Sequence, residues 1–132
     1  MKNYTLFLLL ACVACTAAAQ PADHQASFDA IEKCVRAGDA EALSAWFLNT
    51  VECSLLGEEN NYSKAQATMV LKDFFEKYPP AKFAFKHSSH KRTVKYAIGL
   101  LQTKNNDELR VTILIKEQNE GLAVQQLRIE RD

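Results

Sequence analysis

The part of the chain after Pro79 and Pro80 constrains the fold most, because it consists of strand-like segments joined by short turns. Proline has no backbone N–H and disfavours a helical residue before it, so a helix ends at this pair. Residues 108–116 alternate apolar with mostly polar side chains, which predicts a strand with one buried face. Strands are predicted over residues 82–88, 93–103, 108–116 and 122–130. Their short connections favour an antiparallel meander.

A long amphipathic helix is predicted over residues 64–78, directly before the two prolines. Ser63 and Gln66 have the spacing of a capping box, in which each side chain accepts a hydrogen bond from the other residue's backbone N–H. The apolar positions recur at helical spacing and are Ala67, Val70, Leu71, Phe74, Phe75 and Tyr78. We expect this helix to cover one face of the sheet.

Two short helices and one strand precede the long helix. Ser27 is predicted to cap the first helix, Gly38 to end it, and Asp39 to cap the second. Residues 51–55 alternate as a half-buried strand does, and residues 57–61 are typical of a turn. The apolar positions of the two helices are Phe28, Ile31, Cys34 and Val35, then Leu43, Trp46 and Phe47. The predicted core includes Trp46, Phe74, Phe75 and Ile113.

Residues 1–19 have the order of a secretory signal peptide, with a weakly basic start, an apolar run and small residues at the end. Cleavage after Ala19 would leave Gln20 as the new N-terminus. Residues 20–26 are then expected to form a disordered tether to one domain over residues 27–132. In an alternative interpretation the sequence around Cys12 is a lipoprotein signal, and Cys12 carries a lipid anchor.

The composition is that of a globular protein with one core: 132 residues, 48% of them hydrophobic, and a formal net charge of zero. This charge balance does not predict nucleic-acid binding. Removal of the signal would leave Cys34 and Cys53 in a compartment that permits disulfides. The two form either a disulfide or a pair of buried thiols, and the spacing of the cysteines does not decide between them.

The order of these elements resembles the cone-shaped fold shared by nuclear transport factor two, ketosteroid isomerase and cystatin-like proteins. Residues 62–67, 73–75, 96–99 and 126–130, together with Gly57, are similar to an uncharacterised family of exported Bacteroidota proteins, domain of unknown function 4783. The resemblance implies an α+β cone, in which a curved antiparallel sheet wraps a long helix beside two short N-terminal helices. It also implies a location in the periplasm or on the outer surface of a Gram-negative bacterium, and it supplies no catalytic residues.

Enzymes with this cone fold work in the pocket between sheet and helices, but the apolar faces of the predicted strands carry no Asp or Glu for acid-base catalysis. His87 shares the strand phase of Phe83 and Phe85, so His87 and Tyr96 are expected to point toward the pocket. They would line a ligand site there, with Trp46 as a further contact, or form the polar rim of the core. No catalytic residue and no cofactor is predicted.

A basic hairpin is the one strong charge asymmetry of the chain. Its members include Lys86, His90, Lys91, Arg92 and Lys95. The hairpin either binds an anionic partner or is a solvated element whose lysines discourage pairing of strand edges. His87 and His90 stand three residues apart, which places them on opposite faces of a strand, so no metal site is predicted.

These features favour a non-catalytic binding or interaction module of the bacterial envelope, with a small amphipathic ligand or a protein partner. The alternative is a small isomerase, dehydratase or hydrolase with His87 as base and Tyr96 as polariser. A homodimer formed through the open sheet face is a third hypothesis, which an apolar outward patch would support.

Overall fold

The structure is a computed structural model that describes residues 24–89, 94–118 and 121–132. The expected signal peptide, the start of the expected tether and the basic residues His90, Lys91 and Arg92 lie outside the described residues. The elements are α1 (His24–Ala37), α2 (Ala40–Ser44), β1 (Phe47–Leu55), β2 (Glu58–Ser63), α3 (Lys64–Lys77), β3 (Pro80–Ser89), β4 (Val94–Thr103), β5 (Glu108–Gln118) and β6 (Gly121–Arg131). None of the helices in the described residues is long and apolar enough to cross a membrane.

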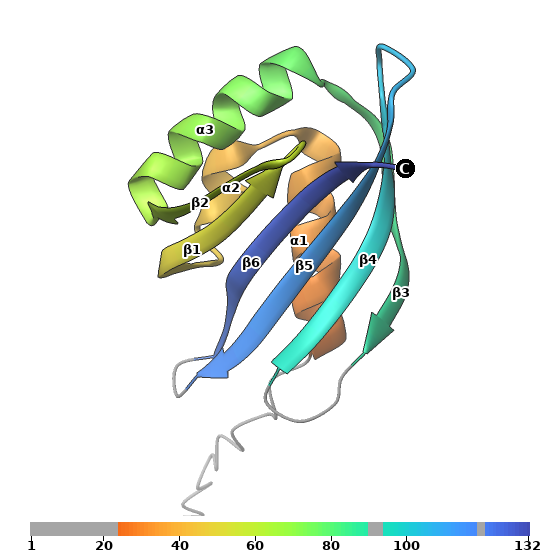
Figure 1. Cartoon of the computed structure of the whole chain (residues 1–132). Coiled ribbons are helices and arrows are strands. Elements are labelled where there is room, and N and C mark those ends of the chain that lie inside the picture. The colour runs from red at the N-terminus through yellow and green to blue at the C-terminus, as the bar shows by residue number, and fades with distance from the viewer. Residues whose placement is uncertain (1–23, 90–93, 119–120) are drawn as a thin grey trace, which may run out of the picture.

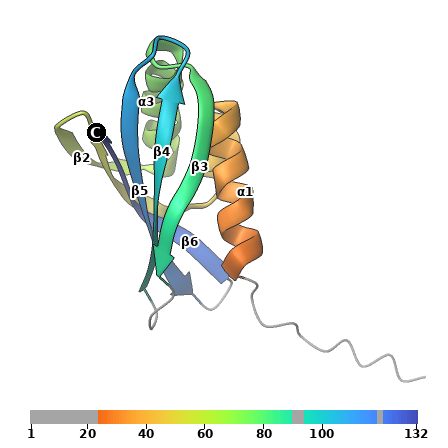
Figure 2. The same ribbon diagram turned by 90° about the vertical axis from the view of Figure 1, so that its right-hand side faces the viewer.

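The strands form one curved open sheet in the order β2-β1-β6-β5-β4-β3. The predicted meander is present, since β3, β4, β5 and β6 pair successively as antiparallel neighbours. The sheet as a whole is mixed, because β1 runs parallel to β6. Figure 1 shows α1 behind the sheet and α3 beside the β1–β2 hairpin, and Figure 2 shows α1 alongside β3. The α+β cone expected from the sequence is therefore confirmed.

Two of the helix starts predicted from capping residues are confirmed, because Ser63 caps α3 and Asp39 caps α2. Ser63 Oγ accepts a hydrogen bond from the Gln66 N–H at 3.2 Å, and Gln66 Oε1 accepts one from the Ser63 N–H at 3.0 Å. Asp39 Oδ1 accepts from the Ala42 N–H at 3.0 Å at the start of α2. Ser27 does not cap α1, because the helix begins at His24, so residues 24–26 are helical rather than a disordered tether.

Two elements of the first half differ from the prediction. The second helix ends at Ser44, and Phe47 begins β1 instead of continuing the helix. Residues 58–63 form the edge strand β2, where a turn was predicted over 57–61. The true turn is limited to Leu56 and Gly57, which have φ angles of 50° and 94°. The residues of β2 are mostly polar, and an exposed edge strand does not need alternating apolar side chains. The strand therefore lacks the sequence pattern by which strands are predicted.

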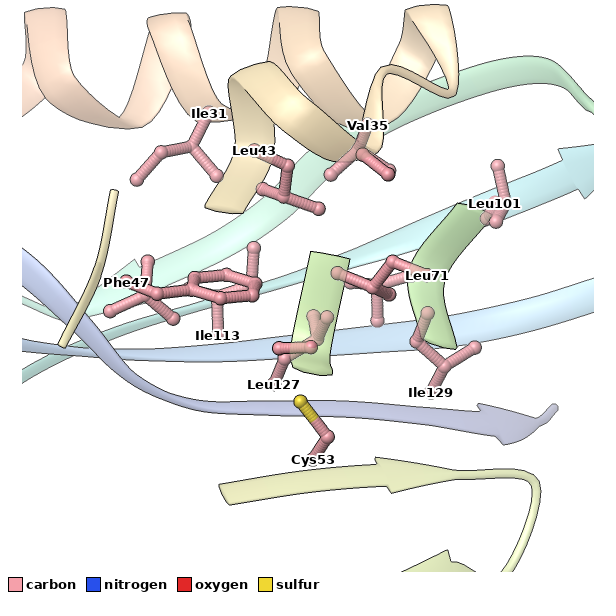
Figure 3. Close-up of a cluster of buried hydrophobic side chains, with 14 of the residues drawn as sticks. Ile31, Val35, Leu43, Phe47, Cys53, Leu71, Leu101, Ile113, Leu127 and Ile129 are labelled. Atoms are coloured by element: carbon pink, nitrogen blue, oxygen red, sulfur yellow. The ribbon is translucent and has the colours of Figure 1, made fainter. Parts of the chain in front are cut away.

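The core fills the space between the sheet and the helices. Helix α1 contributes Ile31 and Val35, α2 contributes Leu43 and α3 contributes Leu71, and all four pack toward the sheet in Figure 3. The fully buried strand residues include Leu101, Leu109, Val111, Ile113, Ile115, Leu127 and Ile129. Of the four predicted core residues, Phe74, Phe75 and Ile113 are buried, whereas Trp46 is half-buried and packs against the core. Burial of this apolar surface is the main stabilising term of such a domain.

β3 packs so closely against β4 at Gly99 that this position has no room for a side chain. A Cβ at this position would lie 2.5 Å from the Ala84 carbonyl oxygen and 2.8 Å from the Phe83 ring. The backbone oxygen belongs to the paired strand and cannot move cheaply. We therefore expect Gly99→Ala to lower the free energy of unfolding by about 1–3 kcal/mol, measured by urea denaturation. Gln102→Ala, at an exposed position of the same strand, is the control and should change stability by less than about 0.5 kcal/mol; equal stabilities would contradict this packing.

Candidate functional site

The inner face of the cone is apolar and carries no buried carboxylate within the residues described. The buried polar side chains of this part of the chain belong to Ser44, Ser54, Lys95 and Thr103. Glu52 and Glu108 are exposed, as expected from their strand phase. An inward acid-base pair of the kind that cone-fold isomerases use is therefore not formed by these residues.

His87 and Tyr96 do lie together, with Tyr96 on the outer face of the sheet and His87 at the rim, where it lines a cavity of about 150 Å³ with Phe28, Asp29 and Glu32 of α1. A β-bulge between Phe85 and His87 shifts the strand phase, so His87 pairs with Ile98 and leaves the face that Phe85 shares with the core. Tyr96 lies on the face opposite to the buried Ala97. Tyr96 Oη and His87 Nε2 are 3.5 Å apart. Tyr96 therefore does not point into the space between sheet and helices, whereas His87 lies at the rim where β3 meets α1. The ligand-binding role of the two residues stays a prediction.

Two residues of the predicted basic hairpin, Lys86 and Lys95, lie in the described part of the chain. Lys86 is exposed on β3. Lys95 instead points to the inner face, where its side chain is only 3% exposed and its ammonium lies 3.1 Å from the Glu117 carboxylate. Lys95 is therefore not available to an anionic partner at the surface, which corrects the prediction for this residue.

The two cysteines are free thiols in the structure. Cys34 lies on α1, and burial is the main reason that its pKa is raised, followed by the charge of Asp39. Cys53 lies in β1, where burial, followed by the charge of Glu52, raises the pKa of its thiol to about 11. Both remain protonated at neutral pH, and a protonated thiol is a poor nucleophile. Of the two states left open by the sequence, the structure has the separate thiols and not the disulfide.

Trp46 connects α2 to β1, and its role as a ligand contact stays a prediction. Its carbonyl oxygen accepts a hydrogen bond from the Val124 N–H at 2.6 Å, and its half-buried ring packs against the core. Trp46 thus holds the start of β1 against β6.

A cavity of about 370 Å³, which we call the hairpin cavity, lies between α3 and the β1–β2 hairpin. One helical face forms its first wall, because residues 70, 73, 74, 77 and 78 recur at intervals of three and four. Tyr62 of β2 forms part of the opposite wall, since it pairs with the buried Val51 and so faces the helix side of the sheet. The lining consists of Leu55, Leu56, Glu58, Tyr62, Val70, Asp73, Phe74, Lys77 and Tyr78.

The hairpin cavity joins an aromatic surface to a charged rim. The Phe74 and Tyr78 rings are 5.0 Å apart between centroids and lie one helical turn from each other. Phe74 is buried and Tyr78 half-buried, so their apolar surface is held in place by the core beneath. Two carboxylates, Glu58 and Asp73, and one ammonium, Lys77, complete the lining. Such a site suits an amphipathic group with a positive end.

Leu56 shapes the cavity at a cost in backbone strain. A leucine with a φ of 50° is in the left-handed region, which disfavours L-residues by about 1–2 kcal/mol. Its N–H donates to the Ile129 carbonyl at 2.8 Å, and its side chain packs against the core. Leu56 also lines a second cavity of about 310 Å³ beside Gly57, Glu130 and Arg131. Leu56 therefore contributes to the lining of two cavities, and glycine, a usual residue in such a turn, would supply no side chain there.

The outer face of the sheet carries a small apolar patch around Leu100. Leu100 is 39% exposed there and pairs with Ala84. A cavity of about 290 Å³ lies over this part of β3 and β4. This patch is the outward apolar surface that the dimer hypothesis requires, but it is small and borders charged side chains.

Sequence reasoning missed the hairpin cavity because it missed β2. Tyr62 was noted only for its family resemblance, and Glu58 was assigned to a turn. The signal that could have found the strand is Leu56-Gly57, a two-residue turn candidate between residues 51–55 and the aromatic Tyr62.

We expect the free energy of unfolding to fall more when Glu117 is replaced than when its ion-pair partner Lys95 is replaced. Glu117→Gln deprives a buried ammonium of this counter-charge, so we expect it to lower the free energy of unfolding by about 1–3 kcal/mol. Lys95→Met removes the buried charge itself, and the freed Glu117 side chain, 43% exposed, can be hydrated by water. This variant should cost less than about 1 kcal/mol. Urea denaturation of both variants and of the double variant tests this; a Glu117→Gln cost no larger than that of Lys95→Met would contradict it.

Comparisons with known proteins agree with this architecture. The chain matches the family described as domain of unknown function (DUF4783) over residues 28–130. The structure of a DUF4783 family protein from Bacteroides ovatus ATCC 8483 is similar, with 24% identity, a TM-score of 0.74, and coverage of 78% of this chain and 93% of that chain. No curated protein matches the chain.

More distant structures share the fold alone. A protein of the NTF2-like family from Streptomyces avermitilis is 12% identical, with a TM-score of 0.63 and coverage of 82% of this chain and 92% of that chain. A domain of unknown function with a cystatin-like fold from Nostoc punctiforme PCC 73102 is 11% identical, with a TM-score of 0.65 and coverage of 81% and 74%. Because the family match spans most of the described cone, this chain belongs to the DUF4783 family, and its fold is of the NTF2-like, cystatin-like type.

Proposed function

We propose that this protein is an exported, non-catalytic binding module of the bacterial envelope and that the hairpin cavity is its binding site. The observation that carries the proposal is the combination of a preformed cavity of about 370 Å³, an aromatic wall and an unbalanced set of charges in its lining. Pockets of this size that combine apolar walls with a few polar groups are typical ligand sites.

The arrangement of ionisable groups supports binding rather than catalysis. An enzyme would use His87 as base and Tyr96 as polariser, but Tyr96 lies on the outer face of the sheet and His87 lies at the rim beside α1. Both thiols have raised pKa values. The hairpin cavity has carboxylates and an ammonium but contains no histidine, cysteine or serine in its lining. A nucleophile with an adjacent base is the usual requirement for covalent catalysis, and this lining does not provide one.

The charges predict which amphipathic ligands the cavity prefers. Glu58 and Asp73 contribute two negative charges, and Lys77 contributes one positive charge. Neither carboxylate has a basic side chain within ion-pair distance among the described residues. A ligand with an aromatic body and a cationic end is therefore favoured over the same body with an anionic end.

Three probes with one common ring test this site: tryptamine, indole and indole-3-acetate. We expect tryptamine to bind most tightly and indole-3-acetate least, with chemical-shift changes at Tyr62, Phe74 and Tyr78 in ¹⁵N-edited NMR titrations. Val70→Trp should fill the cavity and weaken tryptamine binding at least tenfold, because the added ring occupies the space of the probe.

Leu100→Ala, on the outer face of the sheet, is the matched control and should leave tryptamine binding unchanged. Shifts confined to the outer face, or equal binding to the wild type and the Val70→Trp variant, would contradict the assignment of the site.

The export part of the proposal is supported by the signal-like order of residues 1–19. Expressed with its own N-terminus in a Bacteroides host, the protein should be recovered from the cell envelope with an intact mass that begins at Gln20. A mass that begins at a lipid-modified Cys12 would identify a lipoprotein instead. Full-length protein that remains in the cytoplasm would refute export.

A further inference from the structure

The two edges of the sheet differ in whether other parts of the protein cover them. At the β3 edge, side chains of α1 occupy the positions of a neighbouring strand: Glu32 Oε2 accepts from the Phe85 N–H at 3.0 Å, and Arg36 Nε donates to the Phe83 carbonyl at 3.3 Å. Glu32 and Arg36 also form an ion pair with each other. Figure 2 shows α1 alongside β3. This edge is thereby closed to another strand.

The β2 edge has no such cover. Strand β2 pairs only with β1, and Figure 1 shows it at the margin of the sheet beside α3. Within the described residues, the backbone groups of 58–62 that point away from β1 have no hydrogen-bond partner. The strand contains no proline or lysine, and its charged residues are the two acidic ones, Glu58 and Glu59. An open edge of this kind is a template for strand addition.

The hairpin cavity lies directly at this open edge. Glu58 and Tyr62 belong to β2 and line the cavity, while α3 forms the wall opposite them. A chain paired with β2 would lie on the side of β2 away from β1, next to the cavity. Because side chains of a strand alternate between faces, every second side chain of that chain would point toward α3 and into the cavity. Edge and cavity together form one groove that supplies both backbone hydrogen bonds and a side-chain pocket.

The charge of the groove indicates the chemistry of its occupant. Glu58 and Asp73 face the groove, with Lys77 as the only basic lining residue among those described. Glu59 lies on the outer face and is 3.6 Å from Arg128, so its charge is partly compensated. A second copy of β2 would bring further acidic side chains against these carboxylates, and like charges across a strand pair are unfavourable. A basic segment of another protein fits the groove better than a second copy does.

We propose that the β2 edge accepts an extended, basic segment of another protein as an additional strand. One aromatic or apolar side chain of the segment occupies the hairpin cavity, and a lysine or arginine lies beside Glu58 and Asp73. The proposal rests on the binding function proposed above and names its partner class. Backbone pairing supplies the affinity, and the cavity supplies the selectivity for the anchoring side chain.

The test uses the blocked peptide acetyl-TKVYVKT-amide, in which the tyrosine and both lysines share one face. We expect it to bind the purified protein and to slow hydrogen exchange of amides in residues 58–62. Two N-methylated versions separate strand addition from simple occupation of the cavity. One is methylated at both valines and the other at both lysines, which blocks opposite edges of the extended peptide. One version should lose at least tenfold in affinity while the other binds like the parent; equal behaviour of the two overturns the proposal.

A charge exchange tests the orientation of the basic side chains. Glu58→Lys should weaken binding of the parent peptide about two- to fivefold. The same substitution should strengthen binding of acetyl-TEVYVET-amide by a similar factor. Leu100→Ala, on the outer face, is the control and should change neither affinity. If Glu58→Lys weakens both peptides equally, the proposed placement of the lysines is wrong.

Failure of strand addition can be told apart from failure of the binding site itself. If tryptamine shifts the cavity resonances but no peptide protects residues 58–62, the strand proposal is overturned and the cavity remains a small-molecule site. If neither the peptide nor any of the three indole probes binds, both proposals fail. Peptide binding that appears only as protein dimerisation, detected by light scattering, would assign the edge to a second copy.

Discussion

The parallel pairing of β1 with β6 is the interaction on which the rest of the structure depends. It brings the first strand of the chain against the last, and in this register Cys53 lies opposite Leu127 and Leu55 opposite Ile129. Without it the C-terminal meander would be a four-stranded sheet with β6 as an open edge. With it the sheet gains the β1–β2 hairpin, and the hairpin is placed beside α3. The hairpin cavity exists only because these two ends of the chain meet.

The hairpin position is maintained by a backbone hydrogen bond and by burial, which together offset the backbone strain at Leu56. Leu56 adopts an unfavourable left-handed conformation, yet its N–H is bound to the Ile129 carbonyl and its side chain rests on the core. Helix α3 is held against the opposite side by Leu71 and Phe74, which are part of the same core. Both walls of the cavity are therefore rigidly supported, which reduces the entropy cost of binding a ligand there. The glycine that follows Leu56 has a φ of 94°, a conformation that allows the tight turn.

The candidate site also shows why residue types alone are a weak guide to function in this fold. His87 and Lys95 are candidate functional residues by their chemistry, but the structure gives both of them ordinary structural surroundings. A bulge precedes His87, which lies at the rim beside α1, and Lys95 forms a buried ion pair with Glu117. The groove between β2 and α3 is built instead from residues without a recognisable motif. Its properties come from three neighbouring features: an uncovered strand edge, an aromatic helix face and two carboxylates.

The sequence by itself determined the elements whose signals are local. The Ser63–Gln66 capping box, the stop at Pro79 and Pro80, and the alternation of residues 108–116 each depend on neighbours within a few positions, so they predicted α3 and β5 correctly. Together with family resemblance they also indicated the cone. Only the tertiary structure decided the parallel β1–β6 pairing, the polar edge strand β2, the bulge before His87 and the inward turn of Lys95. These depend on contacts between residues far apart in the chain, whose free energies no local pattern encodes.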